Sequence, residues 1–159
     1  MTGRLHLLYG LSGSGKSTLA RRLAEETPAV RFTLDEWMLR LHPELSIHDP
    51  AYGMRADALR ELIWSIAAQV LRSGTDAVLD WNSWSSERRE WAVGRARGIG
   101  AEVILHRLTT SLEESTRRAR CREEAGTAYA HPVDRDGNEH LARLLQEPDT
   151  AEGLEIIIH

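Results

Sequence analysis

The sequence predicts an α/β fold in which helices cover both faces of a parallel sheet. Segments rich in β-forming residues alternate with segments of helical periodicity along the whole chain. A glycine-rich turn of the pattern G-x-x-x-x-G-K-S, at 10–17, joins the first expected strand to the first expected helix. Strand–helix–strand units have right-handed crossovers and parallel strands. The carboxyl ends of these strands are therefore the expected place for a ligand.

The first half of the chain is expected to contain three strands and three helices. Pro28 ends the first helix, and Gly74 ends the long third helix. Asp35 is expected to end the second strand, where it could also cap the next helix. In order, the elements are a strand at 4–9, a helix at 16–26, a strand at 30–34, a helix at 36–41, a helix at 52–73 and a strand at 76–80. The long helix is expected to bury an apolar stripe of Leu59, Leu62, Ile63, Ile66, Val70 and Leu71.

The second half of the chain continues the alternation of helices and strands. Ser85 or Ser86 opens a helix, because a serine at this position can accept bonds from the first helical N–H groups. A helix at 111–124 follows a fourth strand, and 125–138 is turn-rich. The remaining expected elements are the fourth strand at 101–108, a short helix around 139–146 and a last strand at 154–158.

Composition describes one globular domain and excludes several classes of protein. A chain of 159 residues with 42% hydrophobic and 28% charged residues can build one core but not two ordinary domains. The net charge of −4 argues against broad electrostatic binding to nucleic acid. Cys121 is the only cysteine, which excludes an intramolecular disulfide, and the histidines lack metal-binding spacing. With no apolar span and no leader segment, the expectation is a cytoplasmic protein without a membrane partner.

The glycine-rich turn carries the single lysine of the chain, Lys16, among 20 lysines and arginines. Glycines let backbone N–H groups point at phosphate oxygens, and the following helix presents its positive end to the same anion. In this P-loop pattern, Lys16 is expected to bridge the β- and γ-phosphates and Ser17 to bind Mg²⁺. The predicted cofactors are therefore ATP, or GTP, and Mg²⁺. The expected phosphate-binding residues are Gly10, Ser12, Gly13, Ser14, Gly15, Lys16, Ser17 and Thr18.

Two aspartates follow expected strands at the edge of the sheet that holds the P-loop. Asp35 comes after the second strand and can accept a proton from a substrate hydroxyl; its alternative role is a helix cap. Asp80 ends the third strand and can hold the hydration shell of Mg²⁺ or orient the substrate; its alternative role is a turn residue. Asn82 lies at the same edge and is a weaker polar candidate for the acceptor site.

Four arginines lie in the run 117–122, just before the turn-rich segment. Arg118 and Arg122 are four residues apart and therefore lie on one helix face. Arginines that enter from a mobile lid can stabilise the charge on a transferring γ-phosphate. The sequence thus predicts a lid at about 118–138, with Arg118 and Arg122 as catalytic residues. The alternative is a solvated basic face.

Five tryptophans are many for a chain of this length. Trp37, Trp81 and Trp84 all follow strand ends, where they could either wall an acceptor pocket or pack in the core. Trp64 and Trp91 sit in amphipathic helices and are expected in the core. We include Trp37 and Trp84 in the candidate acceptor site, together with Arg40.

In combination, these residues resemble the small P-loop kinases related to polynucleotide 5′-kinase, chloramphenicol phosphotransferase and zeta-toxin kinases. The family's aspartate after strand two, the proposed general base, is matched by Asp35. Its D-x-N segment with a downstream arginine pair is matched by 80–82 and by Arg88 and Arg89. The arginines at the start of the family's lid are matched best by Arg118 and Arg122.

The resemblance extends from Leu5 to about Leu145. It implies one P-loop kinase domain over 1–159, built as a three-layer sandwich. Its five-stranded parallel sheet is expected to have the order 2-3-1-4-5, with a mobile lid. The oligomeric state stays open, because a tryptophan cluster can also form a dimer patch.

The leading hypothesis is an ATP- and Mg²⁺-dependent phosphotransferase that acts on a hydroxyl group of a small molecule. Few basic residues lie between Asp35 and Asp80, whereas a polynucleotide kinase needs a basic channel. Nucleic acid is therefore the less expected acceptor. The resemblance to stand-alone bacterial kinases implies that an antibiotic is one candidate acceptor. The alternatives are a polynucleotide 5′-hydroxyl kinase and a regulatory ATPase without an acceptor.

Overall fold

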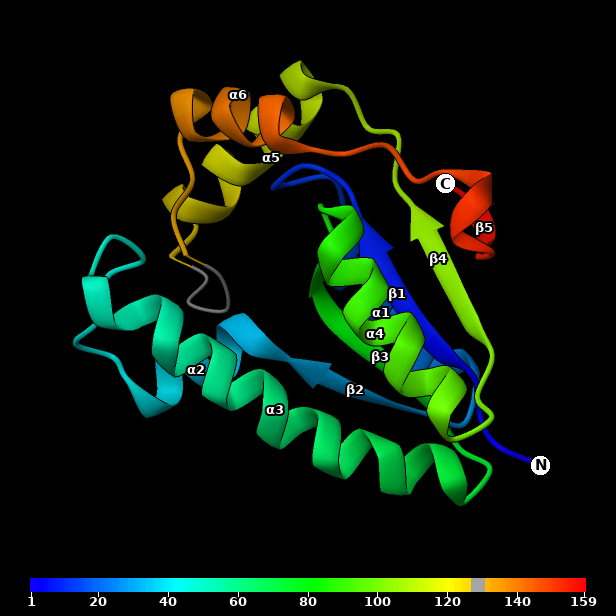
Figure 1. The fold of residues 1–159 in the computed structure, drawn as a ribbon. Helices are drawn as coiled ribbons and strands as arrows, with labels where there is room; N and C mark the ends of the chain where they lie inside the picture. The colour runs from blue at the N-terminus through cyan, green and yellow to red at the C-terminus, as the bar shows by residue number, and fades with distance from the viewer. Residues whose placement is uncertain (127–130) are drawn as a thin grey trace.

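The sheet of this protein has five parallel strands in the order β2-β3-β1-β4-β5, as predicted (Figure 1). The computed structural model describes residues 1–126 and 131–159. The central strand, β1, pairs with β3 on one side and with β4 on the other. The strands are β1 (Leu5–Tyr9), β2 (Ala29–Thr33), β3 (Asp76–Asn82), β4 (Val103–Arg107) and β5 (Glu155–Ile158).

Helices cover both faces of the sheet and gather at one of its ends. On one face, α1 packs on Leu8 and Val78, while α3 and α4 contribute to the larger core on the other face. Figure 1 shows α5 and α6 beside the loop that follows β1. The helices are α1 (Lys16–Glu26), α2 (Leu34–Leu41), α3 (Pro50–Arg72), α4 (Ser86–Gly98), α5 (Leu112–Glu124) and α6 (Arg135–Leu144), with a short 3-10 helix at Thr150–Glu152.

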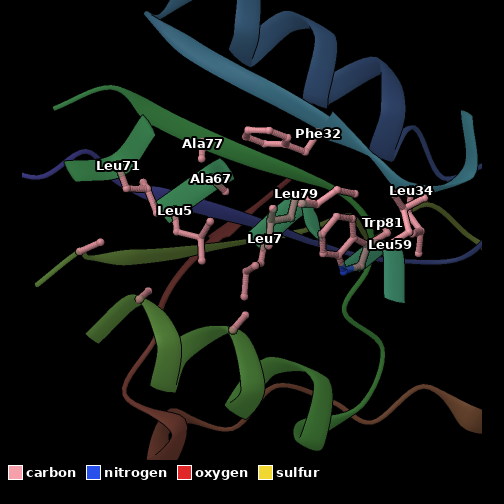
Figure 2. Close-up of a cluster of buried hydrophobic side chains, with 14 of the residues drawn as sticks. Leu5, Leu7, Phe32, Leu34, Leu59, Ala67, Leu71, Ala77, Leu79 and Trp81 are labelled. Atoms are coloured by element: carbon pink, nitrogen blue, oxygen red, sulfur yellow. The ribbon is translucent and has the colours of Figure 1, made fainter. Parts of the chain in front are cut away.

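The larger core fixes the strand ends that carry the polar residues. Figure 2 shows side chains of this core from the sheet and from α3, among them Leu5, Leu7, Leu59, Leu71 and Leu79. These side chains are buried, and burying each stabilises the fold by about 1.5–3 kcal/mol. Of the stripe expected on α3, Leu62 and Ile66 are exposed, so that part of the prediction is wrong. Alanines complete the buried stripe instead, at positions 56, 67 and 68.

Helices α2, α3 and α6 all begin earlier than predicted, α3 by two residues at Pro50. Thr33 caps α2, because its hydroxyl accepts the hydrogen bond from the Glu36 N–H. Asp35 therefore lies in the first turn of α2 and is not the cap. In addition, α6 begins at Arg135, inside the segment expected to be only turns, because Asp134 accepts a bond from the Gly137 N–H.

The predicted lid corresponds to three different parts of the chain. Residues 118–124 belong to the end of α5, and 135–138 belong to the start of α6. Residues 127–130, which fall in the predicted lid, lie outside the described residues. Within the described residues, none of the helices combines the length and apolar character needed to cross a membrane.

Candidate active site

A cavity of about 530 Å³ lies at the carboxyl ends of β1, β2 and β3. It brings together most of the residues predicted from the sequence. Those that line it are Ser12, Gly13, Gly15, Lys16, Ser17, Thr18, Asp35, Asp80, Asn82, Trp84, Arg118 and Arg122. Those that do not line it are Gly10, Ser14, Trp37 and Arg40.

The P-loop forms a cradle that leaves no room for side chains at its tightest point. Gly13 has φ +82° and Gly15 has φ +102°, a backbone region that glycine tolerates at little cost. A Cβ on Gly13 would lie 2.1 Å from the Ser115 carbonyl oxygen. Gly15 is the N-cap of α1 and supplies no side-chain hydrogen bond, so the positive end of this helix faces the cavity without a capping group. These features fit the phosphates of a nucleotide.

Lys16 extends along the inside of this loop. Its Nζ donates hydrogen bonds to the carbonyl oxygens of Gly10, at 2.9 Å, and Leu11, at 2.5 Å. Burial lowers the pKa of Lys16 to about 8, while Asp80 and Asp35 oppose this shift. A phosphate anion beside the ammonium would favour its charged form in the same way.

Ser17 and Asp80 meet through a hydrogen bond in which the Ser17 hydroxyl donates to Oδ1 of Asp80, at 3.1 Å. The other carboxylate oxygen of Asp80 pairs with the Arg31 guanidinium, whose Nε lies 2.8 Å away. Arg31 also pairs with Glu36, at 2.6 Å. A hydroxyl and a carboxylate are oxygen ligands of the kind that Mg²⁺ prefers, directly or through water. The donor set at Ser17 and Asp80 therefore fits this metal.

Asp35 presents a carboxylate to the cavity from the first turn of α2. None of the described residues forms a hydrogen bond with its side chain, although the residue is partly buried. Burial raises the pKa of Asp35, and the charge of Asp80 adds to the shift, while His131, Lys16 and Arg122 oppose it. A carboxylate with a raised pKa is a stronger base, and here its oxygens are available to a ligand.

The two predicted lid arginines reach the cavity from α5. Arg122 donates a hydrogen bond to the Ser12 hydroxyl, at 3.4 Å, which places it against the P-loop. Arg118 also lines the cavity, and its Nε is held 2.7 Å from Glu114. Both guanidinium groups therefore lie on the side of the cavity that α5 forms.

Two asparagines form hydrogen bonds with the backbone of the P-loop, one from β3 and one from α6. Asn82, predicted to contact the acceptor, instead donates to the Gly10 carbonyl at 2.8 Å and accepts from its N–H at 3.4 Å. Asn138 is completely buried and forms the same paired contacts with the backbone of Ser12, at 2.9 and 3.1 Å. No pattern in the sequence points to Asn138, because the segment before residue 139 is expected to be irregular.

The acceptor side of the cavity differs from the prediction at two residues. Trp37 packs edge-on against Phe32, with ring centroids 6.2 Å apart, and therefore belongs to the core. Arg40 is exposed and lies outside the cavity. Tyr52 and His131, by contrast, line the cavity and are joined by a hydrogen bond of 2.9 Å. Burial raises the pKa of Tyr52 to about 12, with Asp35 as a second cause.

Solved structures with the same fold include several kinases. A chain of the Pnkp1/Rnl/Hen1 RNA repair complex has a TM-score of 0.75 and 23% identity, over 91% of this chain. The match spans 44% of that chain, so this protein corresponds to less than half of it. A gluconokinase from Sinorhizobium meliloti 1021 has a TM-score of 0.62 and 17% identity, over 99% of this chain and 82% of the gluconokinase.

A further neighbour is the Mycobacterium tuberculosis APS kinase CysC, in complex with AMPPNP and APS. Its TM-score is 0.58 with 23% identity, over 90% of this chain and 97% of the kinase. No curated protein sequence matches this chain. The family model AAA_33, described as an AAA domain, matches residues 5–148. Its sheet order and P-loop agree with the fold of these kinases, and by the family model the chain belongs to the AAA_33 family.

Proposed function

We propose that this protein transfers the γ-phosphoryl group of ATP to a hydroxyl group of a small molecule, with Mg²⁺ as cofactor. The observation that carries the proposal is the position of Asp35. Its carboxylate, which has no hydrogen-bond partner among the described residues, lines the same cavity as the P-loop lysine. A base in this position serves phosphoryl transfer to a hydroxyl, whereas nucleotide binding alone does not need it.

In this proposal, different residues bind the nucleotide, accept the proton and stabilise the developing charge. Mg²⁺ held by Ser17 and Asp80 would neutralise negative charge on the phosphates. Backbone N–H groups of the P-loop and Lys16 hold the phosphates, and Ser17 with Asp80 holds the metal. Asp35 takes the proton of the acceptor hydroxyl as the new O–P bond forms and the bond to the leaving ADP breaks. Arg118 and Arg122 stabilise the charge on the transferring group.

Asp35 also determines the expected pH dependence. The group must be deprotonated to act as a base, and its pKa is raised by burial. The rate of transfer is therefore expected to fall as the pH drops through this raised pKa, at a higher pH than for an ordinary aspartate.

The test is a mass-shift assay of the purified protein with Mg²⁺ and ATP. The panel contains sugars, polyols, hydroxy acids, nucleosides and hydroxyl-bearing antibiotics, plus one 5′-hydroxyl oligonucleotide. We expect a small molecule to gain one phosphoryl group. Asp35→Asn should reduce that rate by about 10²–10⁴-fold while AMPPNP binding persists. Full activity in Asp35→Asn, or loss of AMPPNP binding, would contradict the role of Asp35.

A polynucleotide 5′-hydroxyl kinase is the second candidate, because the RNA repair chain is similar over 91% of this protein. Phosphorylation of the oligonucleotide alone, with a strong dependence on salt, would select this alternative. Consumption of ATP without any phosphorylated product would instead indicate an ATPase.

A further inference from the structure

A second cavity, of about 790 Å³, lies beside the first one. The two cavities share four lining residues, two arginines and two tryptophans: Arg60, Arg88, Trp81 and Trp84. Arg60 comes from α3 and Arg88 from α4, so the two helices bring their cations to the junction between the cavities. Neither arginine has a role in the proposed transfer step. We call the four residues the junction.

Arg60 lies in the junction and has one guanidinium N–H group without a hydrogen-bond partner among the described residues. Its side chain is 17% exposed. Its Nε is buried and has no hydrogen-bond partner among the described residues. Its charge is paired with Asp57, one turn earlier on the same helix, but that carboxylate is largely exposed. Solvent around the Asp57 carboxylate screens its attraction for the guanidinium, so this pair leaves part of the Arg60 charge uncompensated.

Arg88 faces the same space. Its guanidinium lies over the ring of Trp84, 5.5 Å from the centroid. No described residue forms an ion pair or a hydrogen bond with the guanidinium of Arg88. Burial lowers the pKa of Arg88, and repulsion by Arg60 is the second cause, while Asp57 and Glu87 oppose the shift. Two arginines that repel each other at a cavity wall have a lower free energy when an anion lies between them.

We propose that Arg60 and Arg88 bind an anionic group of the phosphoryl acceptor, with Trp84 as the apolar wall against its carbon skeleton. This inference rests on the proposed function. It makes the acceptor a small hydroxyl compound that also carries a carboxylate, sulfate or phosphate. The junction belongs to both cavities, so one molecule can reach Asp35 with its hydroxyl and the arginines with its anionic group.

The charges around the second cavity favour a small acceptor over a nucleic acid strand. Besides Asp57, which pairs with Arg60, two acidic residues, Glu61 and Glu87, line this cavity. A polyphosphate backbone that continued outward from the junction would meet these carboxylates at unfavourable distances. A compound with one anionic group ends at the arginines and avoids them.

The first experiment measures binding and does not require catalysis. The P-loop is saturated with Mg²⁺ and AMPPNP, and inorganic sulfate is titrated while the arginine Nε–H and tryptophan indole N–H signals are followed by NMR. We expect saturable shifts at Arg60, Arg88 and Trp84. Arg88→Gln should weaken this binding by at least about 10-fold. Arg97→Gln is the matched control, because Arg97 lies on α4 and lines neither cavity.

The second experiment measures transfer to pairs of compounds that differ in one anionic group. The pairs are glycerate and glycerol, gluconate and sorbitol, and adenosine 3′-monophosphate and adenosine. We expect kcat/KM to favour the anionic member by about 10- to 100-fold in the wild type and in Arg97→Gln. Arg88→Gln should remove most of this preference.

The two experiments separate failure of the inference from failure of the proposed function. Transfer to neutral compounds without sulfate binding at the junction would overturn the anion site and leave the kinase intact. Sulfate binding that depends on Arg88, with no transfer to any compound, would keep the anion site and reject the kinase. Equal effects of Arg88→Gln and Arg97→Gln, or transfer to the oligonucleotide alone, would also overturn the inference.

Discussion

Gly13 is the position at which the phosphate-binding loop and helix α5 approach most closely. An added Cβ would lie 2.1 Å from the Ser115 carbonyl oxygen and 2.9 Å from the Ala119 nitrogen. Both atoms belong to the backbone of α5, which cannot move aside as a flexible side chain would. The positive φ of this residue adds strain for any residue with a Cβ. The loop geometry at Gly13 therefore depends on the absence of a side chain.

Gly13→Ala is expected to weaken AMPPNP binding by at least about 10-fold, because the loop must shift away from α5. Calorimetric titration with AMPPNP and Mg²⁺ measures this effect. Gly94→Ala is the control: Gly94 lies in α4, and no atom within 4 Å would meet its Cβ. This control should keep full affinity and gain up to about 1 kcal/mol of stability. Unchanged affinity in Gly13→Ala would show that the loop tolerates a side chain.

Residues that belong to a local motif could be predicted, and residues that act through distant partners could not. The P-loop pattern located Lys16 and Ser17, and their places beside the cavity follow from the strand–loop–helix order. Asn138 binds the backbone of Ser12 across 126 positions of sequence. Arg31 pairs with Asp80 across 49 positions. Such pairings depend on the packing of α6 and on the register of β2 against β3, which no local pattern contains.

Arg89, in the first turn of helix α4, links three parts of the chain. Its side chain is completely buried, and it forms two hydrogen bonds of 2.7 Å with the Glu152 carboxylate. Its NH1 group also donates to the carbonyl oxygens of Ser83 and Gln146. The arginine therefore joins α4 to the end of β3 and to the segment between α6 and β5. Of the arginine pair matched by resemblance, Arg88 lines the cavities and Arg89 holds the elements together.

Arg89→Met is expected to reduce the free energy of unfolding by about 3–5 kcal/mol, because Glu152 loses its partner and three carbonyl groups lose a donor. Urea unfolding at neutral pH measures the change. Arg120→Gln breaks an exposed pair with Glu124 and should change stability by less than about 1 kcal/mol. Glu152→Gln, which keeps the contacts of Arg89 to carbonyl groups, should cost less than Arg89→Met. An equal effect of Arg89→Met and Arg120→Gln would show that the buried pair is not a support.

The sequence predicted which segments are helices and strands better than it predicted which residues each of them buries. The long helix α3 was expected from its periodicity, yet the stripe of large apolar residues placed Leu62 and Ile66 in the core. The structure buries Ala56, Ala67 and Ala68 in their place, beside the large residues of the same face. The periodicity of a helix shows that it has an apolar face. The size of the apolar residues does not show which of two adjacent faces packs against the sheet.

A line of polar side chains crosses the sheet from β3 to the end of β5. His6 lies 3.3 Å from the Asp76 carboxylate and 2.9 Å from His106, which in turn lies 2.9 Å from His159. His6 and His106 are buried, whereas His159 is exposed. These contacts involve four of the five strands or their ends, so they report on the integrity of the whole sheet. Isolated histidines without metal spacing gave no indication of this line.

One arrangement of protons satisfies all three contacts while the histidines are neutral. The pKa of Asp76 is lowered, chiefly through the hydrogen bond from the Arg4 N–H against the effect of burial, so its carboxylate accepts. His6 then donates from Nε2 and accepts at Nδ1 from Nε2 of His106. His106 accepts at Nδ1 from Nε2 of His159. Adding a proton to His106 disrupts this order and places a charge inside the sheet.

The electrostatic surroundings also oppose a charge on His106. Burial lowers the pKa of His106 to about 4, and His6, His159 and Arg22 of α1 contribute to the shift. Burial also lowers the pKa of His6, and Arg4 adds to this, while Asp76 and Glu155 oppose it. The unfolded chain, in contrast, takes up a proton at His106 near pH 6.5. Between these two values the unfolded state binds more protons, so stability decreases as the pH falls.

His106→Gln should therefore lose less stability on acidification than the wild type, by about 3 kcal/mol between pH 6.5 and pH 4. The difference follows from the pKa of His106, which burial lowers from 6.5 in the unfolded chain to about 4 in the folded protein, because each pH unit between these values is worth about 1.36 kcal/mol. Urea unfolding at intervals across this range measures the slope, which separates the pH effect from any constant cost of the substitution. His48→Gln, in an exposed loop, should follow the wild-type curve. Parallel curves of unfolding free energy against pH for His106→Gln and the wild type would contradict the prediction. They would mean that His106 binds protons equally in the folded and unfolded states, because only a difference in bound protons changes the slope of such a curve.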